Sequence, residues 1–183
     1  EITINSADPN VDIYYTTDGS EPSQFSTQYN GPFTVSATTV VKTLAISTDN
    51  SFLKSHVEYH TYFIDEDHSL PVVSIAGESV TTLLNGTQNE PMGSFELFNE
   101  NGNRVADATG EFNKHGNDSW AYQQRGIDYI SRDQFGDDYA LKYGIFDEEI
   151  TERDEFQRVI LKAAANDNYP FEDGGAHIRD AYV

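Results

Sequence analysis

The class of fold follows from the stretch VDIYYTTDGSEP at residues 11–22. Its first part, residues 11–17, is mostly β-branched or aromatic and favours a strand. The Asp18-Gly19-Ser20 segment and the proline after it favour a turn, because Asp can bond its own backbone, Gly accepts positive φ and Pro removes a hydrogen-bond donor. Further β-rich runs follow at residues 38–46 and 57–63 with no helical period between them. This spacing predicts a β-sandwich over residues 1–66.

A second β-rich unit is expected after the charged stretch at residues 65–69, so the predicted domains are 1–66 and 67–183. Leu70-Pro71 restarts the extended pattern, because proline keeps the residue before it out of helical geometry. The expected elements are a short helix at residues 80–84, a hairpin turn at Asn101-Gly102, and strands at residues 72–75, 94–98, 127–131 and 159–161. The prediction for the whole chain is therefore a mainly β protein, with a β-sandwich followed by a β-rich α+β lobe.

Charge and composition exclude several classes of protein. The 183 residues carry 11 Lys plus Arg against 31 Asp plus Glu, a net charge of −20 that repels phosphate backbones and excludes nucleic acid as a partner. No apolar run approaches the roughly 18 residues that a membrane-spanning helix needs. The chain has no cysteine, hence no disulfide, thiolate metal site or thiol nucleophile. It starts at Glu1 without a signal peptide, and we expect it to be an excerpt of a longer protein.

Aromatic and histidine side chains provide candidate binding residues. Trp120 and Tyr122 are candidates for a sugar-stacking platform, with ordinary half-buried packing as the alternative. His56, Glu58 and His60 alternate on one face of a strand. Neighbours two apart lie about 6.6 Å from each other along a strand and could chelate zinc, whereas the two histidines would lie roughly 13 Å apart, which is too far for a single zinc ion.

Acidic clusters at residues 65–67, 137–138 and 147–149 offer oxygen ligands for Ca²⁺, but none has the spacing of an EF-hand loop. A solvated acidic surface is the alternative interpretation. The sequence contains no nucleophile-elbow, zinc-protease or phosphate-loop motif, so hydrolase chemistry has no support in it.

The first unit resembles a known family. Besides the strand and turn quoted above, it contains Tyr29-Asn30-Gly31-Pro32-Phe33 and a Thr- and Val-rich run ending in Leu44-Ala45-Ile46. These segments are similar to the immunoglobulin-like domain at the C-terminus of chitobiases and β-hexosaminidases, an accessory β-sandwich common in secreted bacterial proteins. The resemblance implies that these residues build strands and turns and are not catalysts.

The second unit resembles the beginning of the CotH kinase-like family, secreted or spore-coat proteins with a divergent protein-kinase fold. The similar segments, in the family's order, include Leu70-Pro71-Val72-Val73-Ser74-Ile75, Lys114-His115-Gly116-Asn117, Gln124-Arg125, Asn166-Asp167 and Ile178-Arg179-Asp180. The family usually has Lys where this chain has Arg125, so the resemblance implies that Arg125 is the candidate nucleotide-binding residue. A surface Arg paired with a carboxylate is the alternative.

The kinase-like resemblance also implies where catalysis would take place. In such a fold the catalytic Asp and the metal-binding residues belong to a later lobe. No catalytic residue is therefore expected among residues 1–183, and ATP and Mg²⁺ would bind only to the complete parent.

Two functions of different classes fit these observations. The first is a fragment of a secreted or surface multidomain bacterial CotH-like protein, extracellular or at the cell surface. The complete parent would phosphorylate a protein substrate, and the fragment alone would be inactive. The second is a non-catalytic adhesion module that binds a polysaccharide or a surface protein.

The charge predicts that stability depends on salt. At a net charge of −20, self-repulsion opposes the compact state. Screening shortens the range of that repulsion to about 10 Å at 0.1 M salt. We expect the melting temperature to rise between low and moderate NaCl in a thermal scan followed by circular dichroism. A flat or falling curve would show that the carboxylates are locally paired.

Overall fold

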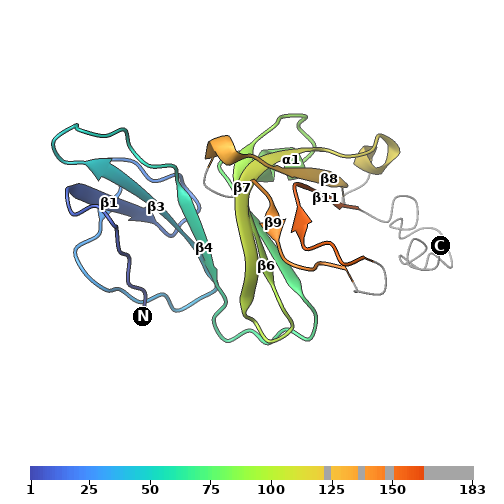
Figure 1. The fold of residues 1–183 in the computed structure, drawn as a ribbon, viewed down its shortest axis with the longest axis horizontal. Helices are drawn as coiled ribbons and strands as arrows, with labels where there is room; N and C mark the ends of the chain where they lie inside the picture. The colour runs from blue at the N-terminus through green and yellow to red at the C-terminus, as the bar shows by residue number, and fades with distance from the viewer. Residues whose placement is uncertain (122–124, 136–138, 147–150, 163–183) are drawn as a thin grey trace. The chain divides into compact units, whose positions relative to one another are not determined.

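The structure is a computed structural model that describes residues 1–121, 125–135, 139–146 and 151–162. Over these ranges the chain is mainly β, with antiparallel strand pairs and one short α-helix, as the sequence predicts (Figure 1). It divides into two compact units. The first comprises Glu1–Glu78 and Ser94–Asp107, and the second comprises Ser79–Gly93 and Ala108–Val183. The sequence-based boundary at residues 65–69 stays a prediction.

A four-stranded antiparallel sheet in the order β2-β1-β3-β4 forms the N-terminal part of the first unit. Its strands are β1 (Val11–Thr16), β2 (Thr27–Gln28), β3 (Thr39–Ser47) and β4 (Glu58–Tyr62). An isolated bridge between Ile2 and Phe33 packs on this sheet, because the ring of Phe33 stacks on that of Tyr15 at 4.3 Å between centroids. The buried apolar residues are Ile2, Val41, Leu44 and Tyr59. The runs at residues 11–17 and 38–46 were thus correctly predicted as strands.

A five-stranded sheet in the order β11-β8-β7-β6-β5 contains the main strands of the remaining chain. Those strands are β5 (Val72–Ala76), β6 (Met92–Phe98), β7 (Arg104–Lys114), β8 (Ile127–Ser131) and β11 (Arg158–Leu161). The short elements are α1 (Val80–Leu84), β9 (Leu141–Lys142), β10 (Glu155–Phe156) and two 3-10 helices, η1 (Asp118–Ala121) and η2 (Asp133–Phe135). Within the described ranges, no helix is long and apolar enough to cross a membrane.

The predicted helix at residues 80–84 and the predicted strands of this sheet are confirmed, as is the turn at Asn101-Gly102. Strand β7 is the second arm of the predicted hairpin, but its residues were not themselves identified as a strand. Its buried positions hold Ala106, Ala108, Gly110 and Phe112, so it lacks the β-branched run that identifies a strand in sequence. Gly110 is required there, because a Cβ atom would lie 2.2 Å from the carbonyl oxygen of Ile130.

The strands of the second unit alternate between an apolar and a polar face, as period-two geometry dictates. Phe112 and Tyr129 are fully buried on one face, with ring centroids 5.1 Å apart. Asp128 lies on the other face and is 5% exposed. Its carboxylate contacts Arg158 at 2.5 Å and His115 at 3.2 Å, so the buried charge is compensated.

A buried carboxylate also connects β4 with β6 inside the first unit. Glu96 is 1% exposed and accepts hydrogen bonds from the Thr61 backbone N–H at 3.0 Å and from the Thr61 hydroxyl at 2.5 Å. Arg104 adds a charge-assisted bond at 3.1 Å. The Thr61 N–H belongs to β4, an end strand of the four-stranded sheet, so Glu96 satisfies a donor that no neighbouring strand satisfies.

We expect Glu96→Ala to lower the free energy of unfolding by about 3 kcal/mol, because it leaves the Thr61 N–H and hydroxyl without their acceptor and removes one carboxylate partner of Arg104. Glu96→Gln keeps an acceptor oxygen and should cost less. Urea denaturation measures both effects. Glu100→Ala, an exposed acidic residue in the turn after β6, is the matched control and should change stability by less than about 0.5 kcal/mol. Equal effects of Glu96→Ala and Glu100→Ala would contradict this account.

Candidate binding site

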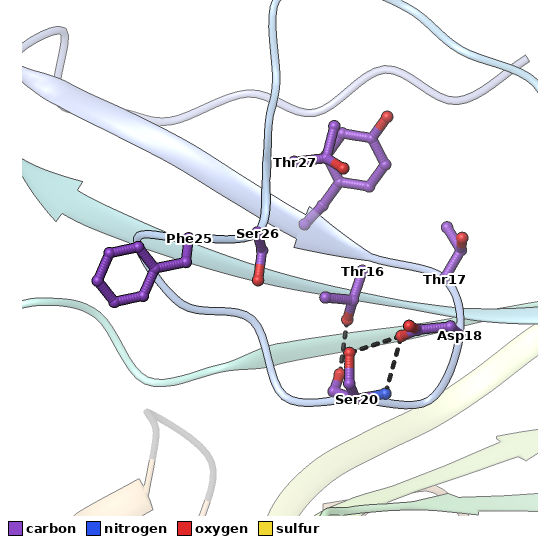
Figure 2. A pocket seen from close by; sticks show the side chains of 8 residues that line it. Thr16, Thr17, Asp18, Ser20, Phe25, Ser26 and Thr27 are labelled. Carbon is purple, nitrogen blue, oxygen red and sulfur yellow. Dashed lines mark hydrogen bonds between the residues drawn. The ribbon is translucent and has the colours of Figure 1, made fainter.

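A pocket opens beside the turn that follows β1 (Figure 2). Its volume is about 290 Å³, and it is lined by residues 15–18, 20 and 25–27. The lining comes from the end of β1 and from the loop that leads into β2, which is the segment with the strongest turn chemistry in the sequence. Hydroxyl side chains predominate, accompanied by two aromatic residues and one carboxylate.

The turn is stabilised by its own side chains. The Ser20 backbone N–H and the Ser20 hydroxyl both donate to Asp18 Oδ1, at 3.0 and 2.6 Å, and Gly19 adopts a φ of 87°. The Thr16 hydroxyl donates to the Ser20 carbonyl at 2.6 Å. The hydrogen bonds from Ser20 lower the pKa of the Asp18 carboxyl below its ordinary value. Asp18 is therefore an ionised acceptor at neutral pH.

A buried cation holds this turn against the sheet. Lys42 on β3 is 3% exposed, and its Nζ donates to the Gly19 carbonyl and to Glu21 Oε1, each at 2.7 Å. The Tyr59 hydroxyl on β4 donates to Glu21 at 3.2 Å. Burial, followed by the negative charge of Glu21, raises the pKa of the Tyr59 phenol far above its ordinary value. These contacts tie the turn to both β3 and β4.

Two kinds of group in the pocket are available to a ligand. The Phe25 side chain is 89% exposed and projects from the loop, away from the other labelled side chains (Figure 2). The hydroxyls of Thr17 and Thr27 make no hydrogen bond within the part of the chain that the structure describes. The pocket thus combines an exposed ring with hydroxyl donors and acceptors, a set suited to binding rather than to bond cleavage.

Trp120, predicted as a sugar platform, lies in η1 of the second unit. Its indole N–H donates to the carbonyls of His115 and Gly126, both at 3.0 Å. Lys114 Nζ and Arg125 Cζ lie 5.4 and 5.8 Å from its ring centroid. The other platform residue, Tyr122, lies outside the described residues. Sugar binding at Trp120 stays a prediction.

Arg125, the candidate nucleotide contact, has structural partners. Its Nη1 donates to the carbonyl of Leu84, the last residue of α1, at 2.7 Å. A Cβ atom at Gly86 would come within 3.1 Å of its Nη2, so glycine leaves room for the guanidinium. The structure therefore places Arg125 between the end of α1 and the ring of Trp120. Its contact with a phosphate stays a prediction.

The candidate metal ligands are His56, Glu58 and His60 of one predicted strand and the acidic clusters. Glu58 and His60 lie on β4, whereas His56 precedes that strand, and His60 Nδ1 lies 2.8 Å from Arg104 Nη1. Among the described residues, no group of three His, Cys, Asp or Glu side chains could hold a metal ion. The clusters at 137–138 and 147–149 lie outside the described residues, and Ca²⁺ binding there stays a prediction.

Comparison with known proteins identifies the first part of the chain. Residues 2–62 match the family model described as "Fn3 associated", so they form an Fn3-associated, Ig-like β-sandwich module. No curated protein and no solved structure matches the chain. The match covers the pocket, the Lys42 contacts and all four strands of the first sheet.

Sequence reasoning missed both Phe25 and the role of Lys42. Lys42 did leave a signal, since a lone cation within an apolar strand must find a partner when it is buried. Phe25 left none, because an isolated aromatic residue between polar neighbours carries no periodicity.

We expect Lys42→Met to lower the free energy of unfolding by about 3 kcal/mol, because it keeps the apolar stem and leaves Glu21 without its buried counter-ion. Chemical denaturation measures the loss. Lys54→Met is the matched control, since Lys54 is exposed in the same module, and it should leave stability within about 0.5 kcal/mol of the wild type. A Lys42→Met protein as stable as the control would show that the ion pair contributes nothing.

Proposed function

We propose that this chain is part of a secreted or surface-exposed multidomain bacterial protein of the CotH-like type. In this proposal an accessory sandwich of the chitobiase C-terminal kind occupies residues 1–66, and the N-terminal lobe of a divergent kinase fold occupies residues 67–183. The observation that carries the proposal is the Fn3-associated module of residues 2–62, an accessory type of domain, followed by a lobe built around an antiparallel β-sheet. The ordered CotH-like segments and the net charge of −20 also support it.

The proposed parent transfers phosphate from ATP to a protein partner, while this chain alone does not. Phosphoryl transfer needs metal ions on the β- and γ-phosphates and a residue that positions the nucleophile, and in a kinase fold both come from the second lobe. Arg125, the phosphate contact that the resemblance implies, donates instead to a main-chain carbonyl. A lone guanidinium would leave most of the transition-state charge unstabilised.

A phosphoryl-transfer assay tests this proposal. Residues 1–183, incubated with labelled ATP, Mg²⁺ or Mn²⁺ and a generic protein acceptor, should give no incorporation above a sample without protein. The longer parent chain should give incorporation in the same assay. Incorporation by the fragment that is lost in Arg125→Ala, and kept in the exposed-residue control Arg153→Ala, would mean that the fragment already holds a complete active site.

A second candidate function is a non-catalytic module that attaches the protein to a polysaccharide or to another surface protein. The pocket at residues 15–27 specifically favours it, because a small ligand can bind in a concave site of about 290 Å³ that is lined by hydroxyl groups and two aromatic residues. Neither function excludes the other, since an accessory module can bind while another lobe reacts.

A further inference from the structure

We propose that the pocket at residues 15–27 is a binding site for a neutral polysaccharide, with Phe25 as the stacking platform. The inference rests on the binding function proposed above and names its ligand class and residues. No catalytic step is involved, because the pocket holds a single carboxylate, whereas glycoside hydrolysis needs a pair.

Phe25 supplies the apolar contact. Its side chain is 89% exposed, and its ring projects from the loop that lines the pocket, away from the other labelled side chains (Figure 2). Exposing a large aromatic ring leaves its apolar area in water. A pyranose ring that stacks on the phenylalanine removes that apolar area from water. Its axial C–H bonds, which carry partial positive charge, are also attracted to the aromatic face, which carries partial negative charge.

The hydroxyl side chains that line the pocket supply the polar contacts. A sugar presents hydroxyl groups that both donate and accept, and the Thr17 and Thr27 hydroxyls can do the same. Asp18, kept ionised by the hydrogen bonds from Ser20, adds a carboxylate that accepts from sugar hydroxyls.

The size of the pocket and the charge of the chain further limit the class of ligand that can bind. A volume of about 290 Å³ accommodates a small part of a chain, such as one or two sugar units, rather than a folded partner. The net charge of −20 and the ionised Asp18 repel polymers that carry carboxylate or sulfate groups. A neutral polymer escapes that repulsion.

The site is also held in shape before any ligand arrives. Lys42 binds the Gly19 carbonyl and Glu21, and the Thr16 hydroxyl binds the Ser20 carbonyl, so the loop wall is fixed to the sheet. A fixed wall loses little conformational entropy on binding. Weak individual sugar contacts therefore suffice for measurable affinity, especially on a polymer that offers repeated units.

The test is a binding assay with the complete 183-residue chain. The probes are insoluble cellulose, insoluble chitin and soluble galactomannan as neutral polymers, with polygalacturonate as the acidic comparison. The variants are Phe25→Ala and Thr27→Val. Phe52→Ala is the matched control, because Phe52 is also an exposed phenylalanine of the same module, 62% exposed and outside the pocket. Unfolding curves of all variants confirm that they fold.

We expect the wild type and Phe52→Ala to bind at least one neutral polymer equally well. Phe25→Ala should bind it at least tenfold more weakly and Thr27→Val several-fold more weakly, and polygalacturonate should not be retained. Equal binding by Phe25→Ala and Phe52→Ala would overturn the assignment of the binding site to the pocket, although the module would still bind the polymer. A wild-type chain that binds none of the three neutral polymers, or that binds polygalacturonate as well, would overturn the ligand class. Neither result would affect the phosphoryl-transfer assay.

Discussion

The ammonium group of Lys42 is the point on which the geometry of the first module depends. It is 3% exposed in a chain that carries almost three acidic residues for each basic one. A buried ammonium is tolerated only when acceptors surround it, and here they are the Gly19 carbonyl and the Glu21 carboxylate. Both acceptors belong to the turn after β1, so the same two contacts neutralise the buried charge and fix the turn. The pocket wall and the position of Glu21 both follow from it.

Glu96 is a second buried charge of the first unit, of the opposite sign, and it too is satisfied by hydrogen-bond partners. Its carboxylate is buried, and its acceptor capacity is used by Thr61 and Arg104. An end strand exposes backbone donors that invite pairing with another chain, and covering one with a side chain is a recognised protection. Both buried charges of the first unit therefore bind backbone groups: Lys42 holds a turn, and Glu96 holds the edge of β4. This use of charge is about positioning and specificity more than net stability.

The sequence predicted most strands because their residues are β-branched or aromatic and are bounded by turn residues, as in residues 11–22. It did not identify β7 as a strand, because its buried positions lack a β-branched run and Gly110 is required by the close approach of β8, a tertiary constraint with no local signal. For the same reason it proposed Trp120, conspicuous as the single tryptophan, and overlooked Phe25. Exposure depends on how a loop folds back, which composition does not report. Lys42 was visible in the sequence, but its partner across the turn was not.

The strand order of the first sheet has a mechanical consequence. β1 and β4 both run antiparallel to β3, so they are parallel to each other. The start of β1 pairs with the end of β3 at Ser47, and the end of β4 pairs with its start at Thr39. A pulling force applied through the chain that enters β1 and leaves β4 therefore acts along the strands, in shear. The backbone hydrogen bonds on both sides of β3 must then yield together rather than open one after another, which makes the module stiff along its own chain direction.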